Sequence, residues 1–171
     1  DGSIRVYYGN GRGKTTAALG LGIRAAGVGK QVIMVQFLKK KHSDTLDFLK
    51  KLEPELQIFR FEKAACGYSD LSPKEKQEQM LNIKNALGYS RKVLDTGQCD
   101  LLILDEIFGL VDYNIITIEE LMDLIAVKKD SMDLILTGRN LPEEVREIAD
   151  CVYSIQREKE KTPEILAQGI S

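Results

Sequence analysis

Short apolar runs alternate with amphipathic stretches along the whole chain. The apolar runs are nearly continuous in valine, isoleucine and leucine, which is typical of strands whose sheet is covered by helices on both faces. The expected strands are Ile4–Tyr8, Gln31–Phe37, Leu56–Phe61, Leu101–Leu104, Leu134–Thr137 and Cys151–Ile155. The stretches between them predict helices near residues 14–27, 44–51, 73–94, 117–128 and 142–149.

Two of the expected helices carry clear start signals. Ser72-Pro73-Lys74-Glu75 combines an N-cap serine, a proline at the first helical position and a capping-box glutamate, and Thr117-Ile118-Glu119-Glu120 repeats the capping box. Alternation of strands and helices predicts right-handed βαβ units around a mostly parallel sheet. We therefore expect an α/β fold, with residues 1–171 forming one domain.

Composition excludes several classes of function. A net charge of −2 argues against a nucleic-acid-binding protein, and no apolar run approaches the roughly 20 residues that span a bilayer. Cys66, Cys99 and Cys151 form no Cys-x-x-Cys pair and indicate reduced thiols, so we expect a cytoplasmic protein. Because His42 is the only histidine, a histidine-based catalytic triad or metal centre is not expected.

A glycine-rich loop follows the first expected strand and precedes a helix. Its residues, all expected to bind nucleotide, are Gly9, Asn10, Gly11, Arg12, Gly13, Lys14, Thr15 and Thr16. In a P-loop of this kind, backbone N–H groups and the helix N-terminus hold phosphate, Lys14 contacts phosphate oxygens, and the Thr15 hydroxyl ligates Mg²⁺. The standard motif has glycine where this chain has Tyr8, so the glycine spacing is one residue shorter. This difference leaves the type of reaction open.

The strand Leu101–Leu104 is followed directly by two acids, Asp105 and Glu106. Beside a P-loop this is the Walker B arrangement, whose carboxylates reach Mg²⁺ or its waters. Two such acids can also cap the following helix. Because side chains alternate along a strand, Asp105 and Glu106 are expected to point in different directions, so that one holds metal while the other positions substrate or structure.

Three further features lie where strands are expected to end, at the carboxyl edge of the sheet. Gln36 is expected either to contact ligand or to be a satisfied strand-end amide. Arg139 is expected either to reach the triphosphate or to lie on the surface of an ordinary turn. The run Lys39-Lys40-Lys41 is either a solvated loop or a basic lip beside the phosphates.

Together these motifs resemble the cob(I)alamin (corrinoid) adenosyltransferases of the P-loop type. The matching segments are Gly9 to Ala18, Val35-Gln36-Phe37-Leu38-Lys39, Leu104-Asp105-Glu106, Thr137-Gly138-Arg139 and Ala167-Gln168-Gly169-Ile170. That family also has the shortened P-loop. The resemblance implies a P-loop NTPase-like (RecA-like) fold and transfer of the 5′-deoxyadenosyl group of ATP to the cobalt of a reduced corrinoid, with tripolyphosphate as the second product. It also implies Mg²⁺ or Mn²⁺, a homodimer and an electron-donating flavoprotein.

The implied chemistry needs no strong acid or base, because Co(I) is the nucleophile and C5′ of ATP is the electrophile. The protein has to align the two and neutralise the leaving triphosphate. In the family the nucleotide lies in the P-loop in the reverse sense, with its α-phosphate facing the corrinoid. We therefore expect Lys14, Glu106 and Tyr68 to act in catalysis. Thr15, Asp105 and Glu106 are expected to hold the metal.

The corrinoid part of the motif set departs from the family. Where the family carries Gly-Phe-Thr-Trp, this chain has Gly67-Tyr68-Ser69-Asp70, which keeps one aromatic ring but loses the tryptophan. We expect Tyr68 to pack near the lower face of the cobalt, in a pocket bordered by residues 62–71 and by a neighbouring subunit. Two alternatives stay open on the sequence: a nucleoside-kinase-like phosphotransferase, and a non-catalytic paralogue that binds ATP or corrinoid.

Overall fold

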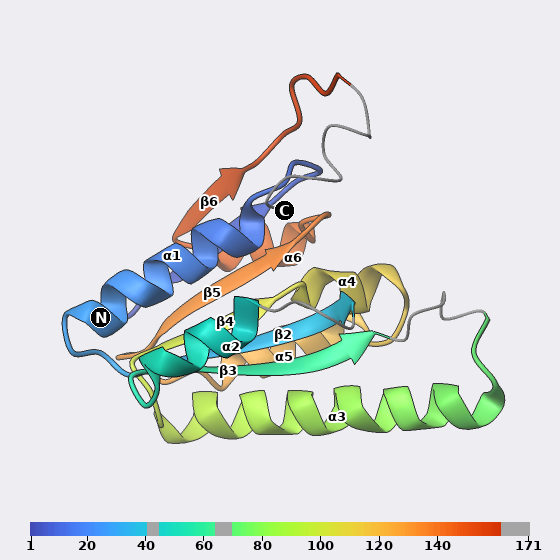
Figure 1. The fold of residues 1–171 in the computed structure, drawn as a ribbon, viewed down its shortest axis with the longest axis horizontal. Coiled ribbons are helices and arrows are strands. Elements are labelled where there is room, and N and C mark those ends of the chain that lie inside the picture. Colours follow the sequence, from blue (N-terminus) through green and yellow to red (C-terminus); the bar gives the residue numbers. More distant parts are fainter. Residues whose placement is uncertain (41–44, 64–69, 162–171) are drawn as a thin grey trace.

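A computed structural model describes the backbone of residues 1–40, 45–63 and 70–161, and the side chains of these residues except 39–40, 45–46 and 62–63. Its centre is a six-stranded sheet in the order β3-β2-β4-β5-β1-β6, in which every pair is parallel (Figure 1). The strands are β1 (Ile4–Tyr8), β2 (Val32–Lys40), β3 (Leu56–Lys63), β4 (Leu101–Asp105), β5 (Asp133–Gly138) and β6 (Cys151–Ser154). The expected parallel α/β architecture is confirmed.

Helices cover both faces of this sheet. They are α1 (Lys14–Gly27), α2 (Thr45–Leu49), the 3₁₀ helix η1 (Lys50–Leu52), α3 (Pro73–Thr96), α4 (Ile107–Asp112), α5 (Ile118–Ala126) and α6 (Glu143–Ile148). One core lies between the sheet and α1, and a larger core lies between the opposite face and α3 to α6. Figure 1 shows α1 and α3 on opposite sides of the strands.

The central strands read as continuous apolar runs because both of their faces are buried. In β2, Val32 and Met34 belong to the core under α1, whereas Ile33, Val35 and Phe37 belong to the core under α3 to α6. Successive side chains of a strand point to opposite faces, so a strand between two helical layers needs apolar residues at every position.

Helix boundaries follow the sequence signals where these exist. The Ser72 hydroxyl accepts the backbone N–H of Glu75, and the Thr117 hydroxyl accepts that of Glu120, so both expected capping boxes form. The short helix α4 was not predicted. It has six residues, too few to show a helical period, and its N-cap is Glu106 in the left-handed region (φ 63°) instead of a serine or threonine.

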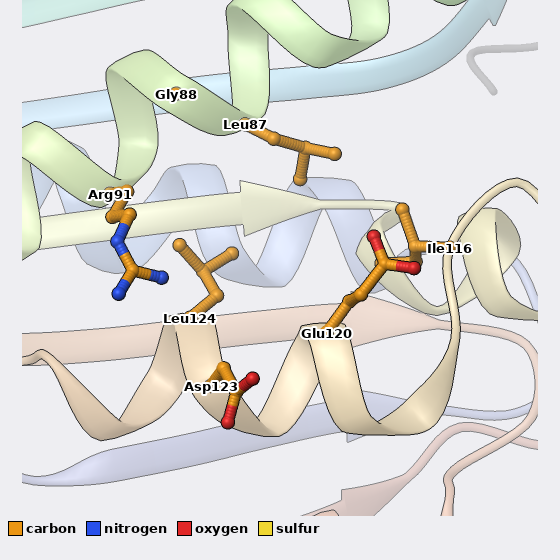
Figure 2. A pocket seen from close by; sticks show the side chains of 7 residues that line it. All are labelled: Leu87, Gly88, Arg91, Ile116, Glu120, Asp123 and Leu124. Atoms are coloured by element: carbon orange, nitrogen blue, oxygen red, sulfur yellow. The ribbon is translucent and has the colours of Figure 1, made fainter.

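A shallow hollow lies between α3 and α5 (Figure 2). It is lined by Leu87, Gly88 and Arg91 of α3, by Ile116, and by Glu120, Asp123 and Leu124 of α5. None of the residues predicted to bind nucleotide or metal lines it. No helix in the described part of the chain is long and apolar enough to cross a membrane.

Two glycines allow a matched test of the packing. A Cβ atom on Gly138, at the end of β5, would lie 2.4 Å from Cβ of Phe108, whereas one on Gly20 of α1 would meet no heavy atom within 4 Å. We expect Gly138→Ala to lower the free energy of unfolding by about 1–3 kcal/mol through overpacking. Gly20→Ala should raise it by up to about 1 kcal/mol, because alanine favours the helix. Urea denaturation of both variants measures the difference, and equal shifts would contradict this packing.

Candidate functional site

The glycine-rich loop joins β1 to α1 and packs against the chain just beyond β6. Gly9 and Gly13 have φ values of 127° and 105°, which side chains rarely tolerate. A Cβ on Gly9 would lie 2.1 Å from the carbonyl oxygen of Ile155, and the N–H of Gly11 donates to that same oxygen (2.9 Å). Close approach of two backbone segments therefore requires glycine here, independently of any ligand.

The loop leaves a helix N-terminus suited to an anion. Gly13 is the N-cap of α1 and provides no side-chain hydrogen bond, and the positive end of the helix dipole lies at this turn, where it favours an anion. The ammonium group of Lys14 reaches back across the loop and donates to the carbonyl oxygens of Gly9 (2.8 Å) and Gly11 (2.9 Å). Lys14 thus places a positive charge over the loop.

Asp105 connects this loop to the sheet. Its side chain is fully buried at the end of β4. Both carboxylate oxygens lie 3.0 Å from the Thr15 hydroxyl, and Oδ1 also accepts the Thr137 hydroxyl of β5 at 2.7 Å. The structure therefore brings together Thr15 and Asp105, two of the three residues predicted to hold metal.

The same carboxylate is bonded to Gln36 on the other side of β4, and Gln36 in turn is bonded to Arg60. Gln36 of β2, only 4% exposed, donates its Nε2 to Oδ2 of Asp105 (3.3 Å). Arg60 of β3 donates Nε and Nη2 to Oε1 of Gln36, at 3.3 and 3.2 Å. The Gln36 amide is thus paired within the protein while touching a predicted metal ligand.

Glu106 takes a different direction from Asp105. Its backbone has the left-handed conformation, its N–H donates to the Thr137 hydroxyl (2.9 Å), and its side chain is half-buried at the start of α4. Glu106 occupies the N-cap position, but its side chain makes no capping hydrogen bond. The expected divergence of the two acids is therefore present, and Asp105 is the one that contacts Thr15.

The other predicted residues lie at the rim of the loop or beyond the described part. Arg12, Thr16 and Arg139 have exposed side chains, and the carbonyl oxygen of Arg139 accepts the N–H of Gly9 (3.1 Å). Asn10 Oδ1 accepts the N–H of Arg157, in the segment after β6, at 3.1 Å. Tyr68, residues 167–170 and the side chains of the lysine run lie outside the described residues.

Two members of the site, Thr137 and Arg60, were not predicted as site residues. Thr137 belongs to the Thr-Gly-Arg motif, in which the prediction concerns the arginine alone. Arg60 is a charged residue near the end of the expected strand Leu56–Phe61, and this position is the one sequence signal for it.

The donor atoms present suit Mg²⁺. Among the described residues no group of three or more histidine, cysteine, aspartate and glutamate side chains could hold a metal alone. Mg²⁺ prefers oxygen ligands, and it commonly takes one or two from the protein and the rest from phosphates and water. The Thr15 hydroxyl and the Asp105 carboxylate match this pattern beside a phosphate-binding loop.

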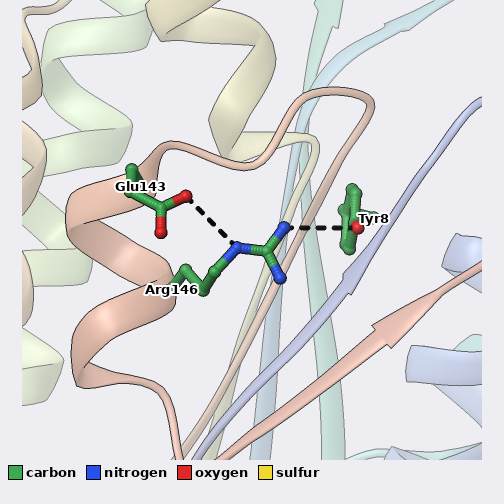
Figure 3. A network of polar contacts seen from close by, with 3 residues as sticks. All are labelled: Tyr8, Glu143 and Arg146. Atoms are coloured by element: carbon green, nitrogen blue, oxygen red, sulfur yellow. Dashed lines mark hydrogen bonds and ion pairs between the residues drawn. The ribbon is translucent and has the colours of Figure 1, made fainter.

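Tyr8 explains why the loop is short. It is still a strand residue, paired with Gly138 of β5 and Ser154 of β6, so the loop begins only at Gly9. Its hydroxyl accepts a hydrogen bond from Nη2 of Arg146 (3.3 Å), whose Nε pairs with Glu143 of α6 (3.3 Å; Figure 3). The hydrogen bond from Arg146 lowers the pKa of Tyr8 below its ordinary value.

Comparison with known proteins identifies a family to which this chain is similar. The family described as ATP:corrinoid adenosyltransferase BtuR/CobO/CobP matches residues 1–170. The corrinoid adenosyltransferase of Escherichia coli K12 is 30% identical over 155 residues, covering 91% of this chain and 76% of that protein. The corrinoid adenosyltransferase CobA of Salmonella typhimurium shows the same identity and coverage.

A solved structure supports the fold. A KaiC-like protein from Pyrococcus horikoshii superposes with a TM-score of 0.56 at 18% identity, covering 90% of this chain and 70% of that one. At this identity the likeness concerns the fold alone. The predicted RecA-like α/β fold is thereby confirmed.

The pairing of Tyr8 with Arg146 can be tested by titration. Arg146→Met should raise the pKa of Tyr8, because the donor that favours the phenolate is removed. Ultraviolet absorbance of wild type should show a tyrosine that ionises early; this transition should move to higher pH in Arg146→Met and disappear in Tyr8→Phe.

The lowered pKa of Tyr8 also predicts how the stability of the protein depends on pH. Because the folded-state pKa of Tyr8 lies below its unfolded value, wild type should gain stability over Arg146→Met at high pH, and lose this gain as pH falls through the folded-state pKa. Arg91→Met, at an exposed arginine of α3, is the control. An unchanged early transition in Arg146→Met would contradict the assignment.

Proposed function

The chain belongs to the ATP:corrinoid adenosyltransferase family, and we propose that it transfers the 5′-deoxyadenosyl group of ATP to the cobalt of cob(I)alamin, releasing tripolyphosphate. ATP-dependent adenosylation of a corrinoid follows from the family. The identities of the reduced substrate and of the second product are our proposal. One observation supports the residue assignments: the contact of Thr15 with Asp105, which joins the phosphate-binding loop to the carboxyl end of β4.

The reaction requires charge stabilisation more than proton transfer. The electron pair of Co(I) forms the bond to C5′ as the bond from C5′ to the α-phosphate oxygen breaks, and that oxygen leaves with the triphosphate. The N-terminus of α1 and the ammonium group of Lys14 are placed to neutralise the leaving group. A bound Mg²⁺, held by Thr15 and Asp105, would add positive charge to the same phosphates.

Further parts of the proposal concern orientation and partners. We expect the short loop to hold the far end of the triphosphate, so that the α-phosphate faces the corrinoid. We expect the corrinoid to lie at the carboxyl edge of the sheet, where open α/β sheets bind their ligands. The contribution of Tyr68, a second subunit and a flavoprotein electron donor remain predictions drawn from the family resemblance.

Removal of the Lys14 ammonium group tests the proposal directly. Wild type incubated with ATP, Mg²⁺ and chemically reduced cob(I)alamin should form adenosylcobalamin and tripolyphosphate. Lys14→Ala should lower kcat/KM by about 10²–10³-fold, the range seen when one charge-stabilising donor is lost. Lys30→Ala, an exposed lysine just before β2, is the matched control. Formation of ADP without adenosylcobalamin by wild type would contradict the proposed reaction.

The two acids should differ in their effect on metal use. In Asp105→Asn, an amide group would face the donors of Thr15, Thr137 and Gln36, so we expect at least a roughly 10-fold rise in the Mg²⁺ concentration for half-maximal activity. Glu106→Gln should change this concentration much less, because Glu106 lies on the turn into α4. Mg²⁺ titrations of both variants measure the difference. Wild-type titration curves for both would exclude Asp105 as a ligand.

A further inference from the structure

We propose that Arg60 is a positioning residue that fixes the Gln36 amide, and through it Asp105, and so sets the affinity of the site for its divalent metal. Arg60 has no assigned role and lies on the edge strand β3. The inference rests on the proposed function, in which Asp105 and Thr15 hold that metal.

Strand register places the three residues in one row. Gln36 is paired with Arg60 across β2 and β3, and with Asp105 across β2 and β4. In each strand, the residues two and four positions earlier are apolar and belong to the core under α1; for Gln36 these are Met34 and Val32. Residues two apart in a strand point to the same face. All three side chains therefore emerge on the face of the sheet beneath α1, at the same level.

The hydrogen bonds assign the orientation of the Gln36 amide. A glutamine amide has one carbonyl oxygen, which accepts, and one NH₂ group, which donates. Both donors of Arg60 bind Oε1, so Nε2 faces Oδ2 of Asp105. Without Arg60 the oxygen end of the amide loses two donors from a charged group and is held less firmly, so the donor that faces the carboxylate is less well fixed.

The row also joins a cation to a buried anion. Asp105 is fully buried, and a carboxylate in that environment is costly unless donors surround it. Arg60 polarises the amide from its oxygen side, and this strengthens the hydrogen bond that the other end donates. Arg60 reaches Asp105, the proposed metal ligand, only through Gln36. Its effect should therefore appear in metal binding and not in the chemical step.

The test is Arg60→Met, which keeps the length of the apolar stem and removes both donors. We expect about a 10-fold rise in the Mg²⁺ concentration for half-maximal activity, the lower end of the range for residues that orient metal ligands. At saturating Mg²⁺, kcat should stay near wild type. Arg60→Lys keeps the charge but loses the two-donor geometry, so its Mg²⁺ concentration for half-maximal activity should lie between those of wild type and Arg60→Met.

A readout without turnover accompanies this titration. The melting temperature of the protein with ATP is measured in EDTA and then with MgCl₂, and the increment due to Mg²⁺ should shrink in Arg60→Met. Arg24→Met, at an exposed arginine in the last turn of α1, is the matched control and should keep the wild-type increment. Circular dichroism of Arg60→Met without ligands shows whether it is folded; if it is not, the same measurements are made on Arg60→Lys.

A double-mutant cycle with Gln36→Met decides whether Arg60 acts through Gln36. If it does, Arg60→Met should add little to the effect of Gln36→Met. Additive effects, or a change confined to the KM of ATP, would overturn the inference in favour of a direct phosphate contact. An unchanged metal titration in Arg60→Met, alongside a weakened one in Asp105→Asn, would overturn the role of Arg60 alone. Unchanged titrations in both would overturn the metal assignment itself.

Discussion

A carboxylate without exposed surface has to be surrounded by hydrogen-bond donors, and this constraint on Asp105 organises the site. Its donors come from the P-loop helix (Thr15), from β5 (Thr137) and from β2 (Gln36). A rearrangement of any one of these elements would remove a donor from a buried charge, which costs more free energy than the hydrogen bond itself contributes. The carboxylate thereby fixes the P-loop relative to the centre of the sheet before any nucleotide binds.

This arrangement suits a reaction in which the protein moves no proton. Alkyl transfer from ATP to cobalt needs an aligned electrophile and a neutralised leaving group, and a rigid set of donors and positive charges provides both without reorganisation. A sheet in which every pair is parallel supplies the rigidity, because the carboxyl ends of β2, β4 and β5 meet at one edge. Membership of the adenosyltransferase family agrees with this chemistry and with the scarcity of histidine.

Much of the fold was predictable because its signals are local. Apolar runs gave all six strands, and the Ser72 and Thr117 capping boxes gave two helix starts. The polar row was only partly predicted: Asp105 and Gln36 were recognised, whereas Arg60 was passed over because its partner lies on another strand, and register between strands is not visible in the sequence. Helix α4 was missed because the left-handed backbone at Glu106 carries no sequence signal in a residue other than glycine or asparagine.

The attachment of the P-loop to the end of β6 has a thermodynamic consequence. Gly11 and Asn10 are hydrogen-bonded to Ile155 and Arg157, just beyond a four-residue strand at the edge of the sheet. Short edge strands open locally at a lower free energy than central strands do. Each such fraying event would release two of the hydrogen bonds that shape the loop. Nucleotide that binds only the loop with these hydrogen bonds intact would then suppress the fraying. Occupancy of the site should therefore increase the hydrogen-exchange protection of β6.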